Sequence, residues 1–247
     1  MSEKKNSASI SGSGTIAGGT YERVSISGSG KVTGEVTADE VRISGAGKIE
    51  GRTHANRITT SGSASFDADV VAEDEMKVSG SAKVTGDVKA KELKCSGAFR
   101  VDGSVSADYV KSSGSLRVGS DLEAEIFRAT GGFRIGGLLS ADHIEIRLAG
   151  HCEATEIGGE RIEVHRGGWK ERSLIMEGLI RVFSGGGAAE LRAQQIEGDD
   201  IHLEGTTARV VRGKRISIGP DCDIERVEYT DTLEVHPDAS VHEHTKR

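Results

Sequence analysis

Residues 24–43 read Val24-Ser-Ile-Ser-Gly-Ser-Gly-Lys-Val-Thr-Gly-Glu-Val-Thr-Ala-Asp-Glu-Val-Arg-Ile43, and this pattern returns along most of the chain. Apolar or small residues alternate with polar ones inside each short piece, which is the period of a half-buried strand. The opening pair, Val24 and Ile26, recurs as Val41 and Ile43 after 17 residues. One such piece is too short to bury a face by itself, so each copy requires the next one stacked against it.

Thirteen copies of the opening pair can be counted in the sequence. They are Val24/Ile26, Val41/Ile43, Ile58/Thr60, Met76/Val78, Leu93/Cys95, Val110/Ser112, Phe127/Ala129, Ile144/Ile146, Ile162/Val164, Ile180/Val182, Ile201/Leu203, Ile216/Ile218 and Leu233/Val235. The step is 17 or 18 residues throughout, except for steps of 21 and 15 on either side of Ile201. A repeat of this kind predicts a solenoid.

The repeat predicts an all-β fold, a single-stranded parallel β-helix with about 17–18 residues per turn. Each unit carries three inward pairs, which indicates three short strands per turn and a triangular cross-section. Neighbouring turns pair in parallel at about 4.8 Å, so thirteen turns give a rod about 60 Å long. We expect a right-handed coil, because parallel crossovers favour that hand. Small residues recur where the chain turns a corner, at Ala38, Ala55, Ala72, Ala90, Ala107, Ala124 and Ala141.

The regularity of the repeat divides the chain into four segments. Residues 1–7 are polar and are predicted to be a disordered tail, and residues 8–146 form the regular β-helix. Residues 147–241 continue it less regularly, with an insertion near 184–200, and residues 242–247 are a C-terminal tail. The expected hinge of this insertion is Ser184-Gly-Gly-Gly187. The bulkier residues before it, Trp169 and the runs 174–176 and 179–183, are interpreted as a wider turn or a packed excursion. Residues 188–196 are interpreted as a strand, with a short helix as the alternative.

Composition narrows the class of protein. Aromatic residues make up 4% of the chain and there are 34 glycines, which does not suit a wide globular core. The net charge of -7 comes without a basic block, so we do not expect a nucleic-acid partner. The three cysteines are widely spaced, and Cys95 falls on an inward position as a small free thiol. No apolar run of about 18 residues occurs, so we expect a cytoplasmic protein without direct membrane insertion.

No catalytic or cofactor-binding motif appears, and we expect no enzyme activity and no cofactor. His236, His242 and His244 have spacing that could hold a divalent metal, but the favoured interpretation is a solvated polar tail, with no metal site.

Three acids on one predicted strand leave an alternative open. Asp121, Glu123 and Glu125 alternate along it, as the surface carboxylates of carbohydrate-active β-helices do, but no long loops are present to build a cleft.

The two ends of the predicted coil carry the functional hypothesis. The first and last turns of an open β-helix present unpaired N–H and C=O groups, which natural sheets usually cover. Neither end of this sequence shows an evident cap, so we expect the ends to join molecule to molecule. The predicted polymerisation interface consists of Ile10 and Ile16 at one end, and Leu233, Val235 and Val241 at the other.

Four segments carry a resemblance to a known family. They are Ile10-Ser-Gly-Ser-Gly14, Val24-Ser-Ile-Ser-Gly-Ser-Gly30, Val78-Ser-Gly-Ser-Ala-Lys-Val-Thr-Gly-Asp-Val88 and Val101-Asp-Gly-Ser-Val105. With these motifs, residues 8–146 resemble the bactofilins, polymer-forming cytoskeletal proteins of bacteria. The resemblance implies nucleotide-independent filaments that scaffold cell-envelope, cell-shape or motility machinery. The chain departs from the family in its greater length, its lack of proline-rich tails and its polar start.

The resulting hypothesis is a non-enzymatic cytoskeletal scaffold that assembles end to end. Its expected partners are further copies of itself, a paralogous bactofilin and cell-envelope proteins, in the cytoplasm or at the inner face of the membrane. The first alternative is a polysaccharide-binding or lyase-type β-helix protein. A left-handed β-helix acyltransferase ranks last, because its hexapeptide period does not produce the observed register.

Overall fold

A computed structural model describes residues 6–167 and 189–247 of the chain. Within these ranges every regular element is a strand, and all strand pairs are parallel. The strands are β1 (Asn6–Ile10), β2 (Ser13–Ile26), β3 (Ser29–Ile43), β4 (Ala46–Ile49), β5 (Thr53–Thr60), β6 (Ser63–Phe66), β7 (Val70–Val78), β8 (Ser81–Val84), β9 (Val88–Cys95), β10 (Ala98–Val101), β11 (Val105–Ser112), β12 (Ser115–Val118), β13 (Leu122–Ala129), β14 (Gly132–Leu148), β15 (His151–Arg166), β16 (Glu190–Leu203), β17 (Thr206–Ile218), β18 (Asp223–Val235) and β19 (Ser240–Lys246). The predicted parallel β-solenoid is therefore confirmed.

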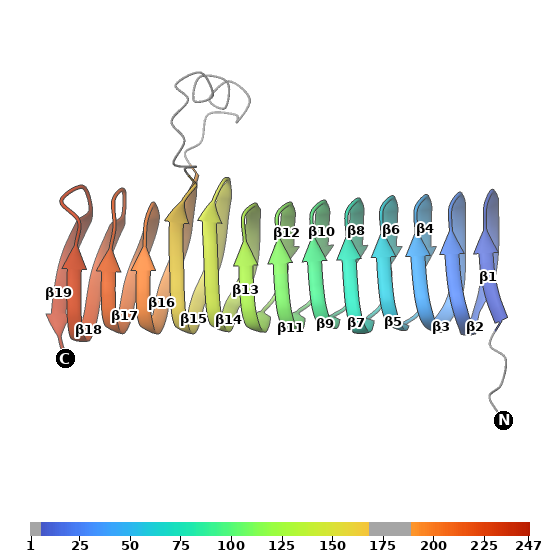
Figure 1. The fold of residues 1–247 in the computed structure, drawn as a ribbon, viewed down its shortest axis with the longest axis horizontal. Coiled ribbons are helices and arrows are strands. Elements are labelled where there is room, and N and C mark those ends of the chain that lie inside the picture. The colour runs from blue at the N-terminus through green and yellow to red at the C-terminus, as the bar shows by residue number, and fades with distance from the viewer. Residues whose placement is uncertain (1–5, 168–188) are drawn as a thin grey trace, which may run out of the picture.

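The turns stack side by side along one axis, with β1 at one end of the rod and β19 at the other (Figure 1). Following the register from Ala8 through Val24 and Val41 to Leu233 passes through one residue of each turn. This column has thirteen members: Ala8, Val24, Val41, Ile58, Met76, Leu93, Val110, Phe127, Ile144, Ile162, Ile201, Ile216 and Leu233.

Each turn has three inward faces, as the repeat predicts. In β9 the inward side chains are Val88 and Ala90 on one face and Leu93 and Cys95 on the next, and all four are buried. The two exposed or half-buried residues between these pairs mark a corner. Two of the three predicted short strands of a turn thus run together as one strand, and the four-residue strand β10 supplies the third face.

The core is a narrow column of aliphatic side chains. Val24, Val41 and Ile58 are completely buried, and Phe66, Phe99 and Phe127 fill the wider positions. The rings of Phe127 and Phe133 meet edge to face with centroids 5.4 Å apart. A core this thin needs little large apolar surface per turn, which accounts for the low aromatic content.

The irregular steps of the repeat have local causes. The step of 18 from Ile58 to Met76 follows from a bulge between Ala72 and Glu75, where one extra residue enters the turn. The step of 15 from Ile201 to Ile216 begins with a tight corner at Gly205, whose φ of 55° lies in the left-handed region that glycine tolerates.

The turn that precedes β16 differs from the sequence-based prediction. β15 pairs directly with β16, and Ile162 lies opposite Ile201 although 39 positions separate them. No strand therefore lies between β15 and β16 in the sheet, and the pair Ile180/Val182, counted from the sequence as a turn between them, lies outside the described residues. Figure 1 shows β15 and β16 as neighbours in the rod. The first part of the predicted insertion near 184–200 lies outside the described residues, and its part from Glu190 onward belongs to β16.

Several expectations fall at the edges of the described ranges. Residues 1–5, Trp169, the runs 174–176 and 179–183, and the hinge at 184–187 lie outside them. Asn6 and Ser7, predicted to be tail, begin β1, and the last residues of the chain form β19 instead of a tail. The short-helix alternative for residues 188–196 is wrong from Glu190 onward, because that segment pairs as a strand on both sides.

Candidate functional site

The two end turns contain strands that pair on one side. In the described part of the chain, β1 pairs with β2 and β19 pairs with β18, and neither has a second partner. Figure 1 places these two strands at opposite ends of the rod. Their outer edges therefore carry backbone N–H and C=O groups that no strand of the described residues satisfies, which is the arrangement that accepts a further strand.

The predicted interface residues terminate the inward columns of the solenoid. Ile10 and Val235 are the two ends of one column, which runs through Ile26, Ile43 and Ile218. Ile16 and Val241 are the two ends of a second column on another face. Leu233 ends the column that Ala8 begins. The sequence-based set thus lies on two faces of the coil and has members at both ends.

The terminal side chains are more exposed than those of the interior turns. Val235 is 43% exposed, whereas Ile218, its neighbour one turn inward, is 1% exposed. Ile16, Leu233 and Val241 are partly buried and pack against the core. Ile10 is 7% exposed. Each end therefore offers an apolar surface that one further turn of the same fold would cover.

The C-terminal end turn is fastened to its neighbours by charge. Glu228 is buried, and its Oε2 accepts from Arg212 Nε at 2.8 Å and Arg247 Nη2 at 2.6 Å. Arg212, followed by Arg247, holds the pKa of Glu228 below its usual value. Lys246 places its Nζ 6.0 Å from the ring centroid of Tyr229. These contacts tie the end of β19 to β17 and β18.

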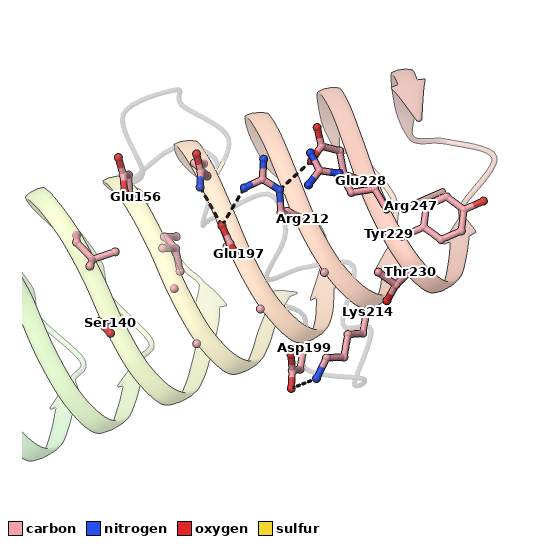
Figure 2. A pocket seen from close by; sticks show the side chains of 17 residues that line it. Ser140, Glu156, Glu197, Asp199, Arg212, Lys214, Glu228, Tyr229, Thr230 and Arg247 are labelled. Carbon is pink, nitrogen blue, oxygen red and sulfur yellow. Dashed lines mark hydrogen bonds and ion pairs between the residues drawn. The ribbon is translucent and has the colours of Figure 1, made fainter. Parts of the chain in front are cut away.

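A shallow groove of about 610 Å³ near this end is lined by residues of β14, β15, β16, β17 and β18 and by Arg247. Gly159, Gly198 and Gly213 share one column and leave its floor without side chains. Figure 2 shows charged residues along its sides, including Asp199 paired with Lys214 and Glu197 paired with Arg212. Because these charges are already matched across turns, the groove wall serves to hold neighbouring strands together.

The acids of the carbohydrate-active alternative do not converge. Asp121 Oδ1 accepts a hydrogen bond from the Leu138 N–H at 2.8 Å, so this carboxylate closes a corner between two turns. Asp87 does the same for Ser104 at 2.8 Å, which shows a recurring structural use of aspartate. Glu123 and Glu125 lie exposed on β13.

The histidines of the C-terminal segment have different partners. His242 Nε2 lies 3.0 Å from Asp223 Oδ1, and His236 Nδ1 accepts from the Asp238 N–H at 3.1 Å. His244 pairs in register with Val227, beyond a corner from His242. They belong to β19 and to the bend before it, and none of them is part of a group of three or more potential metal ligands among the described residues.

A different cluster was missed from the sequence. His165, His202 and Glu204 form the one group of three or more potential metal ligands within residues 6–167 and 189–247. The signal that could have found it is the equivalence of Val164 with Leu203, which brings His165 next to Glu204. Counting Ile180/Val182 as an intervening turn hid that neighbourhood.

The three cysteines are free and buried, as expected for Cys95. Burial raises the pKa of each thiol, and that of Cys152 reaches about 11. They therefore behave as small core side chains and not as nucleophiles.

The fold and its end surfaces define an elongated parallel β-solenoid with open sheet edges. Residues 5–106 match the family model of the bactofilins, whose description is polymer-forming cytoskeletal. The predicted resemblance to this family is thereby confirmed, over a match that covers less than half of the chain.

Two curated relatives, both from Bacillus subtilis strain 168, are similar to parts of the chain. The uncharacterized protein YhbE is 39% identical over 108 residues, which is 43% of this chain and 42% of YhbE. The uncharacterized protein YhbF is 47% identical over 57 residues, which is 23% of this chain and 24% of YhbF. The chain thus spans well under half the length of the curated relatives it matches.

No solved structure matches the chain. Within residues 6–167 and 189–247, no helix has the length and apolar character needed to cross a membrane.

Proposed function

We propose that the protein is a non-enzymatic cytoskeletal scaffold that assembles end to end into filaments without nucleotide. The observation that carries this proposal is the way the inward columns end. Three inward columns run through thirteen turns and stop at the predicted apolar residues, beside strand edges that have no second partner among the described residues. The bactofilin match over residues 5–106, to a polymer-forming cytoskeletal family, supports the same assignment.

The proposed interface consists of the predicted set, Ile10, Ile16, Leu233, Val235 and Val241. Docking of another copy against either end would bury these side chains and pair the free strand edges. The burial of these side chains and the pairing of the strand edges both favour association. Apolar burial contributes about 25 cal/mol per Å², and the backbone amides of the edges exchange water for protein partners. Nucleotide plays no part in these contacts, since they need only strand edges and apolar side chains.

The proposed scaffold role includes further partners and a location in the cell. We infer that the filament organises cell-envelope, cell-shape or motility machinery, in the cytoplasm or at the inner face of the membrane. A paralogous bactofilin is a second candidate subunit, because a chain with the same turn geometry presents the same kind of edge.

Electron microscopy of the purified protein without added nucleotide tests the proposal. The wild type is expected to form filaments, whereas Ile16→Asp and Leu233→Arg are expected to give short soluble species. A charge at either position would have to be buried without a partner on assembly. Ser106→Asp is the matched control, because Ser106 is exposed on β11 in the middle of the rod.

Filaments of normal length from both end variants would contradict the interface, provided that circular dichroism shows the wild-type fold. A monomeric wild type at high concentration would contradict assembly itself. Release of unsaturated products from acidic polysaccharides in the presence of calcium would instead favour the lyase-type alternative.

A further inference from the structure

Two adjacent turns bring two histidines and a glutamate together on the outside of the solenoid. His165 lies near the end of β15, His202 lies near the end of β16, and Glu204 follows β16 directly. Val164 pairs with Leu203, so the outward-facing neighbours of these core residues lie side by side. One ligand atom from each of His165, His202 and Glu204 falls within 4.8 Å of the others. All three residues are half-buried and remain accessible to a small ion.

Neighbouring groups orient two of these side chains. His202 Nδ1 lies 3.3 Å from Ser217 Oγ, which leaves Nε2 directed at Glu204 Oε1 at 3.4 Å. The other carboxylate oxygen, Glu204 Oε2, accepts the backbone N–H of Arg166 at 2.7 Å. Outer partners of this kind hold metal ligands in place in known sites.

The surrounding charges favour a cation. Burial acts to raise the pKa of Glu204, but the Arg166 N–H and His202 together hold it below its usual value, so the carboxylate is ionised. Glu163 adds a second carboxylate, with Oε2 3.9 Å from His165 Nε2. The guanidinium of Arg166 is paired with Asp221 and does not compete for Glu204.

We propose that His165, His202 and Glu204 bind a divalent transition-metal ion of the Zn²⁺ type. Imidazole and carboxylate are ligands that suit Zn²⁺, and two histidines with one glutamate leave a fourth tetrahedral position for water. Ligand atoms of a tetrahedral zinc site lie about 3.3 Å apart, from metal–ligand distances of about 2.0–2.1 Å. The observed 3.4 Å between His202 and Glu204 already matches that spacing.

The bound ion fastens the solenoid where its chain connection is longest. Ile162 and Ile201 are neighbours although 39 positions separate them, whereas the other turns take 15 to 18 residues. Closing a longer connection costs more conformational entropy. A metal that bridges β15 and β16 in the folded state alone stabilises this junction by mass action.

Equilibrium dialysis of the full-length protein against ZnCl₂ tests the site, with thermal unfolding as a second readout. The wild type is expected to take up one tightly held Zn²⁺ per chain and to unfold at a higher temperature with the ion. His202→Ala and Glu204→Gln are expected to bind at least about 10-fold more weakly and to lose the thermal shift. His143→Ala is the matched control, since His143 is exposed on β14 outside the cluster.

Equal affinity and stoichiometry in the wild type, His202→Ala and Glu204→Gln would overturn the proposal, because the ion would then sit elsewhere. Failure of the wild type to bind Zn²⁺ would overturn it as well. The buried thiols do not compete for the ion, because burial keeps them protonated. Should one variant unfold, His165→Gln provides an independent removal of a ligand, and its metal-free unfolding temperature is the check on folding.

Discussion

Thr60 shows how a single residue departs from the pattern of its column. Its side chain is completely buried between Ile43 and Val78, in the column that Ile10 begins and Val235 ends. Its Oγ1 has no hydrogen-bond partner in the described residues. A buried hydroxyl without a partner costs free energy, because it loses its bonds to water. Threonine fits this inward position because its side chain has the branched shape of valine.

Replacement of Thr60 by valine is expected to stabilise the protein by about 1 kcal/mol, because it removes the unpaired hydroxyl and keeps the side-chain shape. For a chain of this size that is a rise of about 2–4 °C in the unfolding temperature. Thermal unfolding followed by circular dichroism measures it. The control is Thr59→Val, since Thr59 faces outward on the same strand and should change stability by less than about 0.5 kcal/mol. Equal shifts in both variants would contradict this explanation.

At the scale of the strand and its corner, glycine acts through close approach more than through unusual backbone angles. Glycines recur at one corner of successive turns: Gly28, Gly45, Gly62, Gly80, Gly97, Gly114 and Gly131. A Cβ on Gly97 would overlap the carbonyl oxygen of Gly80 in the preceding turn. None of the seven has a positive φ; within the described residues Gly19, Gly34 and Gly205 are the glycines that do. The spacing between turns, and not handedness of the backbone, therefore requires glycine at this corner.

Replacement of Gly97 by alanine is expected to destabilise the protein by about 1–3 kcal/mol, because two stacked corners must move apart. Gly158→Ala is the matched control, since a Cβ there would meet only Leu138 Cδ1 at 3.8 Å, an ordinary contact. Chemical denaturation of both variants compares their free energies of unfolding. A Gly97→Ala protein as stable as the Gly158→Ala protein would show that the turns can separate without cost.

Charged side chains on the outside add a second link between elements. Lys48 reaches Asp67 at 2.9 Å and Lys83 reaches Asp102 at 3.0 Å, each across neighbouring turns. Exposed pairs of this kind each contribute less than about 1 kcal/mol. Acids and bases thus pair between turns on the stacked surface, in agreement with a moderate net charge of -7 without a basic block.

At the scale of the whole molecule, the rod has two chemically similar ends, and the way they meet can be read by cross-linking. Ile10→Cys and Val235→Cys place a thiol at either end of one column. In an assembled filament that contains both variants we expect disulfide-linked species under mild oxidation, because the docked edges bring the ends into contact. A disulfide that joins one molecule of Ile10→Cys to one of Val235→Cys shows that unlike ends meet. A disulfide that joins two molecules of the same variant shows that like ends meet.

The control for this experiment is Ser106→Cys, exposed on β11 at mid-rod, which should not cross-link in the same filaments. The native thiols do not interfere, since all three are buried. Cross-linking of Ser106→Cys as efficient as that of the end variants would contradict the end-to-end arrangement and favour lateral contacts.

The regular turns could be predicted from the sequence because each turn contacts little beyond its two neighbours. In such a fold each step of the repeat along the chain, as from Val24 to Val41 to Ile58, is also one turn along the rod. The local repeat therefore determines which residues stack on one another. The three inward faces and the buried Cys95 follow from the same period. The apolar ends of the columns, and hence the proposed interface, could be named from the repeat for the same reason.

Where one step of the repeat no longer corresponds to one turn of the rod, only the tertiary structure shows which strands are neighbours. Between Ile162 and Ile201 the distance along the chain no longer measures the distance along the rod, and only the backbone pairing of β15 with β16 shows that they are adjacent. The grouping of His165, His202 and Glu204 depends on that pairing. Likewise, the last residues of the chain become a strand because β18 offers them an edge, which their polar side chains did not indicate. Strands pair through backbone N–H and C=O groups, which nearly every residue type provides, so side chains say little about which edges pair. The sequence therefore determined the repeating coil, and the tertiary structure determined the pairing of β15 with β16 and of β18 with β19.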